Sequence, residues 1–193
     1  MACRAAGPRR QALRHRRRHQ RDPALPDRAG VGRRVIRPLT AADLSAALAL
    51  QADGYPEALW DGEKAFVSRM TVAPEWCWAL ERGGRLEGYL LSHPWTSMSP
   101  PVPDTTLERA EGDIWYIHDL STARAARGRG VGRALLAACE AAHPQIRRSE
   151  LVAVDGAEPY WRRLGWRPAM TGSVVAKVAK YGSAAVYMAR DWG

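Results

Sequence analysis

Apolar positions in the first half of the folded region follow two different spacings. A helical spacing follows Thr40–Asp43, which resembles a capping box with Asp in place of Glu, and predicts a helix through Leu50. The same spacing predicts a second helix over residues 62–70. Short apolar runs instead predict strands over residues 35–37, 76–81 and 86–91.

The turn Arg82-Gly-Gly-Arg85 joins the last two of these strands and is a strong hairpin signal. We expect Pro94 to end the pair and residues 95–103 to form a Pro- and Ser-rich loop. The second half predicts helices over 131–142, stopped by Pro144, and 158–164, and strands over 113–121, 150–154, 166–178 and 184–190. Hairpins followed by a helix crossover indicate a mixed sheet with helices on both faces.

The net charge of +9 belongs to one segment. Residues 1–34 hold eleven arginines and two aspartates, so they carry all of it, and the rest of the chain is neutral. This segment has almost no aliphatic residues and no apolar periodicity, so it cannot bury enough surface to offset its ordering entropy. We therefore expect residues 1–34 to be a disordered extension and residues 35–193 to form one domain.

Three roles are open for the extension. Arg14-His-Arg-Arg-Arg-His19 could contact the phosphates of nucleic acid or of an acidic membrane surface, or the segment could be an Arg-rich targeting peptide. It could also be an upstream extension without function. We favour the last, because no aromatic residue lies among the arginines to stack on bases. We accordingly expect neither a nucleic-acid nor a membrane partner.

Cysteine content and hydropathy bear on the compartment. The three cysteines are odd in number and share no metal or redox spacing, which favours a reducing cytoplasm and no metal site. Cys139 falls on the inner face of a predicted helix, where core packing is expected. No apolar run approaches the roughly twenty residues that span a bilayer, and no secretory signal is present.

The stretch Arg124-Ala-Ala-Arg-Gly-Arg-Gly-Val-Gly-Arg133 stands between a predicted strand and a predicted helix. Glycines let the backbone bend and approach a ligand, and the first turn of a helix presents unpaired N–H groups to an anion. The stretch therefore predicts a phosphate-binding turn. A P-loop would need Lys and Ser or Thr after Gly132, and a dinucleotide fingerprint would need Gly at position 133, where Arg stands. Glu150 also lies at the wrong end of its strand for a ribose-binding acid.

Two motifs resemble the GCN5-related N-acetyltransferase (GNAT) family. Arg127-Gly-Arg-Gly-Val-Gly132 is similar to its acetyl-CoA signature, Arg/Gln-x-x-Gly-x-Gly/Ala, and His118–Thr122 looks like its fourth strand. Downstream, Ala157–Trp166 resembles the family's Ala-x-x-Phe-Tyr-x-x-x-Gly-Phe helix. The resemblance covers about residues 35–190. It implies a single α/β domain (an α+β mixed sheet, mostly antiparallel) and acetyl transfer from acetyl-CoA to an amine by direct attack.

The resemblance also implies roles for particular residues. The acetyl-CoA cradle carries over to the turn as Arg127, Gly128, Arg129, Gly130, Val131, Gly132 and Arg133. The strand edge that pairs with pantetheine carries over to Leu120, Ser121 and Thr122, with an N–H at or beside Leu120 facing the thioester oxygen.

The general base is where the sequence departs from the family. Many relatives carry a Glu within the fifth strand, yet Leu151–Val154 is wholly apolar, and the family's Asn after it is absent. Replacement bases are His118 and Asp119, which strict alternation would place on opposite faces of their strand. His118 has the more suitable unperturbed pKa.

The general acid departs from the family too. The family's Tyr position falls on Trp161, and Tyr160 is displaced by about 100° around the helix. A turn of the helix, helped by the short Asp155-Gly156 connection and Pro159, would bring Tyr160 into the role. Alternatively the thiolate leaves unaided.

The acceptor is expected between the loop Gly54–Asp61 with Glu63 and the C-terminal strands, where Tyr181 and Tyr187 could reach it. The acceptor could be a small molecule or a protein amine, and a homodimer is one option for assembly. Rival hypotheses are a catalytically silent acetyl-CoA-binding module and a protein that acts through its basic extension.

Overall fold

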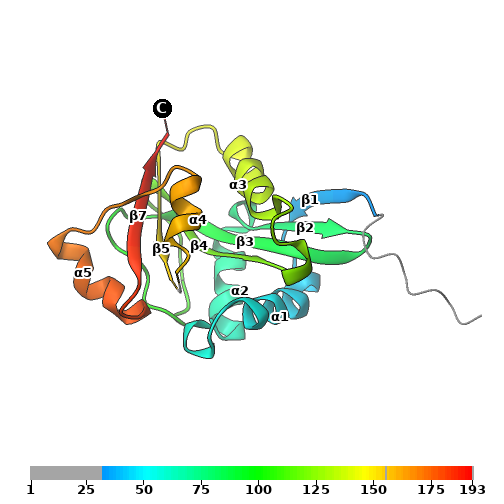
Figure 1. Ribbon diagram of the computed structural model, residues 1–193, viewed down its shortest axis with the longest axis horizontal. Helices are drawn as coiled ribbons and strands as arrows, with labels where there is room; N and C mark the ends of the chain where they lie inside the picture. The colour runs from blue at the N-terminus through cyan, green and yellow to red at the C-terminus, as the bar shows by residue number, and fades with distance from the viewer. Residues whose placement is uncertain (1–31, 155, 193) are drawn as a thin grey trace, which may run out of the picture.

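A computed structural model describes residues 32–154 and 156–192 (Figure 1). These residues form one seven-stranded sheet in the order β1-β2-β3-β4-β5-β7-β6. All neighbouring strands are antiparallel except β4 and β5, which are parallel. The predicted mixed, mostly antiparallel sheet is confirmed. The predicted disorder of residues 1–34 falls almost wholly outside the described residues and stays a prediction.

The strands are β1 (Arg34–Pro38), β2 (Trp78–Arg82), β3 (Arg85–Trp95), β4 (Ile114–Thr122), β5 (Arg148–Ala153), β6 (Arg167–Pro168) and β7 (Val186–Asp191). The α-helices are α1 (Leu44–Gly54), α2 (Glu63–Val72), α3 (Val131–Ala142), α4 (Glu158–Arg163) and α5 (Gly172–Val178). Before α1, the Asp43 carboxylate accepts bonds from the N–H and hydroxyl of Thr40 at 2.9 and 2.8 Å, which confirms the predicted capping interaction.

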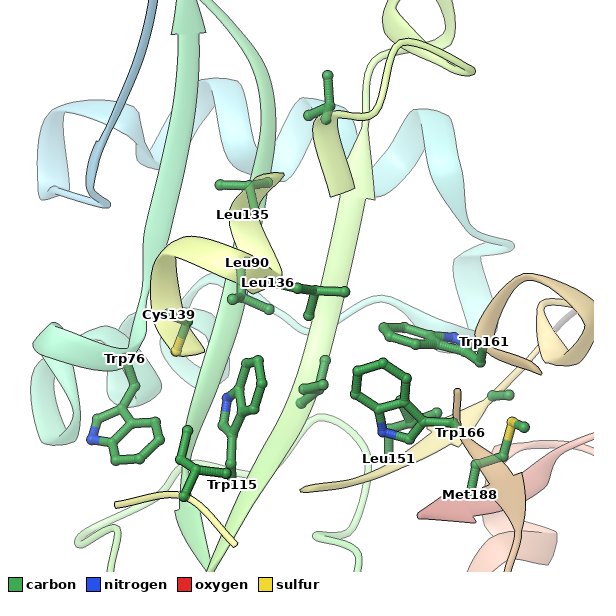
Figure 2. Close-up of a cluster of buried hydrophobic side chains, with 14 of the residues drawn as sticks. Trp76, Leu90, Trp115, Leu135, Leu136, Cys139, Leu151, Trp161, Trp166 and Met188 are labelled. Atoms are coloured by element: carbon green, nitrogen blue, oxygen red, sulfur yellow. The ribbon is translucent and has the colours of Figure 1, made fainter. Parts of the chain in front are cut away.

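Helices cover both faces of the sheet, as predicted. In Figure 1, α1 and α2 lie on one side of β2–β4 and α3 lies on the other. The larger core lies under α3 and α4, and Figure 2 shows Trp161 and Trp166 beside Leu151 and Met188. Cys139 is fully buried in this core, and burial raises its pKa to about 12, so the core position predicted for it is confirmed.

The β2–β3 hairpin forms where its turn residues predict it. Gly83 and Gly84 have φ angles of 56° and 79°, a left-handed pair that two glycines adopt without strain. We expected Pro94 to end this hairpin pair, but the pairing of β3 with β2 already stops at Leu90. The strand β3 itself continues through Pro94 to Trp95 and pairs with β4 up to Ile114, and a missing N–H is tolerated on the side that no longer pairs with β2.

Residues 166–178 are not a long strand, which corrects a second prediction. Only Arg167–Pro168 pair with β7, and Gly172–Val178 form α5. The β-branched valines at 174 and 178 suggest a strand, but their four-residue spacing buries both on one side of a helix, against Tyr116 and Tyr187.

Candidate active site

A split between the two parallel strands opens the middle of the sheet. β4 and β5 pair only from Trp115–Ser149 to Ile117–Leu151, although β4 runs on to Thr122 and β5 to Ala153. Beyond the last pair, two adjoining cavities lie between the strands, and both are lined by Tyr55, Leu120, Val154 and Ala157.

The larger cavity is a groove of about 760 Å³, a size typical of small-molecule sites. It runs from the end of α1 across β4 to the first turn of α3 and to α4. Its lining includes most of the residues that the resemblance assigned to acetyl-CoA: Leu120, Ser121, Thr122, Arg127, Gly128, Gly130, Val131, Gly132 and Arg133. The structure brings these residues together.

The start of α3 presents unpaired backbone donors to this groove. Gly130 is the N-cap residue in a left-handed conformation (φ 74°), and the first helical bond of the turn runs from Ala134 N–H to its carbonyl. The N–H groups of Val131, Gly132 and Arg133 therefore precede any intrahelical partner. The same arrangement favours anions through the helix dipole.

Arg129 does not line the groove, which departs from the predicted cradle. Its N–H donates to Ala126 O at 3.2 Å, and its carbonyl accepts from Arg34 at 2.9 Å. The N–H of Arg127 is likewise used within the turn, by Arg124 O. A short 3₁₀ turn over Arg124–Ala126 takes up these donors, so the open amides start later than the motif alone implies.

The edge of β4 offers amides to the groove at alternate residues. Ala123 N–H donates to Glu87 O of β3 at 2.9 Å. Amide groups alternate sides along a strand, so those of Leu120 and Thr122 face away from β3, towards the split, whereas those of Ser121 face β3. The Leu120 carbonyl accepts the Tyr55 hydroxyl at 3.4 Å on that side. Leu120 and Thr122 are thus the residues whose main chain can pair with a ligand.

Tyr160 lines the groove, whereas Trp161 is a core residue. The indole of Trp161 is 7% exposed and packs edge-on against Trp166. The Tyr160 hydroxyl lies so close to Gly132 that a Cβ there would clash with it. Burial raises the pKa of Tyr160, and the charges of Arg133 and Arg163 oppose that shift. The predicted displacement of the tyrosine therefore leaves it facing the groove.

The smaller cavity, of about 70 Å³, lies beside the groove and holds the candidate bases. Its polar lining comes from Gln51, Tyr55, Asp61, His118, Asp119 and Tyr181. Gln51 fixes Asp61 by two bonds, accepting from its N–H at 3.1 Å and donating to its carbonyl at 2.9 Å. The Asp61 carboxylate contacts His118 Nε2 at 2.7 Å and Arg69 at 3.3 Å.

His118 and Asp119 lie on the same face of β4, so the prediction of opposite faces is wrong. The β3–β4 register steps from Leu91–Asp119 to Ser92–Ile117, which leaves His118 as the extra residue of a β-bulge. The bulge interrupts the alternation. His118 contacts Asp61, which precedes α2 in the chain. Asp119 accepts a hydrogen bond from the hydroxyl of Tyr89, and the Tyr89 ring packs on Phe66 of α2.

The two candidate bases have different environments. Burial raises the pKa of Asp119, against the hydrogen bonds of Tyr89 and Tyr55. Burial would also raise the pKa of Asp61, but His118 and Arg69 outweigh it and the pKa is lowered. A charge therefore resides on Asp61 more readily than on Asp119.

The predicted acceptor region stays a prediction, and the structure places only some of its residues at the small cavity. Tyr181 lines the small cavity, but the hydroxyl of Tyr187 is bound to Glu150 instead. Glu57 and Glu63 line neither cavity, and Trp60 is 37% exposed with its indole N–H bound to Tyr55 O.

Sequence reasoning missed Arg163, which lines the groove. Its spacing of three from Tyr160 places it on the same side of α4, and that spacing is the signal that could have identified it.

Residues 32–154 and 156–192 hold neither a candidate membrane span nor a candidate metal cluster. No helix there is long and apolar enough to cross a membrane. No group of three or more His, Cys, Asp or Glu side chains there is placed to hold a metal ion.

Comparisons with known proteins identify the family. Among solved structures, the fold is similar to the GphF GNAT-like decarboxylase in complex with isobutyryl-CoA, at 20% identity and a TM-score of 0.65, over 81% of this chain and 98% of that one. It is also similar to Ard1 from Thermoplasma volcanium, at 16% identity and a TM-score of 0.63, over 82% and 97%.

A third similar structure is N-acetylglutamate synthase from Neisseria gonorrhoeae complexed with coenzyme A and N-acetyl-glutamate, at 16% identity and a TM-score of 0.61, over 83% of this chain and 35% of that one. At such identities the likeness concerns the fold. The model of the acetyltransferase (GNAT) family matches residues 45–166, more than half of the sequence. The chain belongs to the acetyltransferase (GNAT) family.

Proposed function

We propose that this protein transfers the acetyl group of acetyl-CoA to a primary amine of a small molecule or a protein. The observation that carries the proposal is the groove in the β4–β5 split, with open amides at the start of α3 and at Leu120 and Thr122. The amides at the start of α3 suit a pyrophosphate, and those of a strand edge suit the amides of pantetheine. Similar structures hold isobutyryl-CoA and coenzyme A, which supports a CoA-type ligand.

In this proposal the amine approaches from the small cavity and attacks the thioester beside Leu120. The Leu120 N–H stabilises the negative charge that develops on the thioester oxygen. Tyr160 supplies a proton to the leaving thiolate. Positioning of the two substrates accounts for most of the rate, because a thioester is already reactive towards a neutral amine.

Calorimetric titration with acetyl-CoA tests the groove. Gly132→Glu adds bulk and a negative charge where the pyrophosphate is expected, so we expect binding to be lost. Gly172→Glu is the matched control: it makes the same change at the first residue of α5, where a Cβ meets no atom of the described residues within 4 Å. Normal binding by a folded Gly132→Glu variant would refute the assignment.

Transfer is measured separately, as release of the CoA thiol with propylamine, alaninamide, isopropylamine and tert-butylamine as acceptors. Faster release with an amine than without one supports the transferase. Binding of acetyl-CoA without release in the presence of any amine would instead indicate the catalytically silent module.

A further inference from the structure

We propose that His118 takes the proton from the acceptor amine through its Nδ1 atom, with Asp61 and Arg69 as positioning residues. The inference rests on the proposed function. The main observation is the His118 side chain, which is 8% exposed and lines the small cavity. One ring nitrogen of His118 is bound to a carboxylate, and the other, Nδ1, is buried and has no hydrogen-bond partner among the described residues.

The partners of Asp61 determine which nitrogen carries the proton. Its Oδ1 accepts from the N–H of Asp104 at 3.0 Å, and its Oδ2 lies 3.3 Å from Arg69. His118 and these two donors all lower the pKa of Asp61, so its carboxylate is ionised. An ionised carboxylate can accept hydrogen bonds but cannot donate them. The Nε2 atom, 2.7 Å away, must therefore donate. Neutral His118 then carries its lone pair on Nδ1.

Three elements hold this arrangement in place. Gln51 of α1 binds both backbone groups of Asp61. Arg69 of α2 is fully buried, and its guanidinium also donates to Ala65 O and Thr105 O at 2.7 and 3.0 Å. The bulge in β4 turns His118 towards them. The imidazole is thus oriented before any substrate binds, as a general base requires.

Charge favours His118 over Asp119 as the base. An imidazolium at His118 would form an ion pair with Asp61, whereas the hydrogen bonds to Asp119 within the described part of the chain come from the neutral hydroxyls of Tyr89 and Tyr55. Other titratable groups close to His118 are His93 of β3 and Tyr116 of β4, whose rings lie 6.2 and 6.4 Å from it, and Tyr181, which lines the same cavity. None of the three provides a negative charge at neutral pH.

The chemistry balances as a single transfer. The amine nitrogen forms a bond to the thioester carbonyl carbon and loses one proton to His118 Nδ1. The C–S bond breaks, its electron pair leaves with sulfur, and the thiolate is protonated to the thiol. His118 then returns its proton to solvent. A cavity of about 70 Å³ holds only a few non-hydrogen atoms, so the acceptor must be an unhindered primary amine.

The tautomer can be observed without any substrate. In long-range ¹H–¹⁵N spectra of histidine-labelled protein, we expect His118 to show a protonated Nε2 and an unprotonated Nδ1. The signal is assigned by its absence from His118→Gln. In Asp61→Asn an amide can donate to Nε2, and we expect the proton to move to Nδ1. A wild-type His118 protonated on Nδ1 would overturn the proposal, whatever the outcome of acetyl-CoA binding.

The second test measures kcat for acetyl transfer to propylamine and to alaninamide. His118→Gln is expected to lower kcat by about 10²–10⁴-fold with acetyl-CoA affinity unchanged, and Asp61→Asn by about 10³-fold. His93→Gln is the matched control, because it removes a buried neighbouring imidazole that lines neither cavity, and its kcat should stay within about threefold.

Two results would contradict the assignment. One is a His118→Gln variant that keeps full activity while Asp119→Asn loses it. The other is faster turnover of tert-butylamine than of propylamine. If acetyl-CoA does not bind the wild-type protein at all, the proposed function fails. The tautomer of His118 then still shows whether Asp61 places the proton on Nε2.

Discussion

Gly132 is the residue at which the groove and Tyr160 constrain each other. A Cβ at this position would clash with the Tyr160 hydroxyl and would lie 3.3 Å from Leu120 Cδ2, a tight contact, whereas the ring carbon that bears the hydroxyl would lie at 3.6 Å, an ordinary contact. We therefore expect Gly132→Ala to shift Tyr160 and weaken acetyl-CoA binding about tenfold, or about 1.4 kcal/mol.

Removing the hydroxyl should relieve that clash. Calorimetry on the Gly132→Ala/Tyr160→Phe double variant should give an affinity within about threefold of Tyr160→Phe alone. If the double variant binds acetyl-CoA as weakly as Gly132→Ala, the methyl group acts through Leu120 or the backbone cradle and not through the tyrosine.

Tyr160 also carries a catalytic prediction. A positioned general acid is typically worth about 10² in rate, so we expect Tyr160→Phe to lower kcat by that factor with near-normal acetyl-CoA binding. Tyr187→Phe removes a hydroxyl that binds Glu150 away from the groove, and it should leave kcat unchanged. A loss of only two- or threefold in Tyr160→Phe would show that the thiolate leaves unaided.

At the scale of elements, Glu150 ties β5 to β7 and to the loop after β3. The side chain is fully buried and accepts from Ser97 Oγ at 2.8 Å, Met98 N–H at 2.9 Å, Arg148 Nε at 2.7 Å and the Tyr187 hydroxyl. Burial would raise the pKa of Glu150, but these donors outweigh it and lower the pKa. Because β5 begins at Arg148, Glu150 lies within the fifth strand, which corrects the expectation that this strand carries no Glu. It lines neither cavity, and both of its oxygens are occupied by these structural contacts.

This cluster predicts a pH-dependent stability. Because the folded pKa of Glu150 is depressed, its contribution is present above the usual value of 4.5 and is lost as pH falls through the folded pKa. At pH 7 we expect Glu150→Gln to lower the free energy of unfolding by about 3 kcal/mol. Urea unfolding at pH 7 and pH 3 should show the difference shrinking in acid.

An exposed partner of the same arginine serves as the control. Asp191 binds Arg148 at 2.8 Å with its side chain 79% exposed, and Asp191→Asn should cost well under 1 kcal/mol. If Glu150→Gln and Asp191→Asn lose the same free energy of unfolding, burial of Glu150 does not determine its contribution to stability.

The sequence predicted elements best where a local signal fixed them. The Gly83-Gly84 turn, the Thr40–Asp43 cap and the glycine-dense start of α3 each depend on residues adjacent in the chain. The predictions that failed concern elements whose structure depends on tertiary contacts. The valines of α5 have strand propensity, and packing against β7 overrides it. The bulge at His118 has no local residue signature, so the joint orientation of His118 and Asp119 could not be anticipated.

For the whole molecule, the sequence predicted the residues of the groove better than those of the small cavity. The motif Arg127–Gly132 is contiguous, so its place in the groove followed from the sequence. The cluster of Asp61, Arg69 and His118 comes from separate parts of the chain, and only the fold brings it together. The loop predicted for the acceptor stays a prediction, and of its carboxylates Asp61 lines the small cavity whereas Glu57 and Glu63 do not.

The charge distribution gives the last prediction, which concerns the extension. Residues 1–31 contain nine arginines and two aspartates, so most of the net charge of +9 lies outside the described residues. The described fold includes Gly32, which closely approaches Gly83, and Arg34, which contacts Arg129 O and starts β1. A chain starting at Gly32 should therefore melt within a few degrees of the full chain and bind acetyl-CoA equally well.

A chain starting at Leu39 removes β1, exposes the edge of β2, and should melt several degrees lower. Thermal melting and calorimetry on the three chains check both outcomes. A large drop in melting temperature for the chain starting at Gly32 would show that the extension docks on the domain, and salt-dependent nucleic-acid binding lost with residues 1–31 would reveal a role in phosphate contacts.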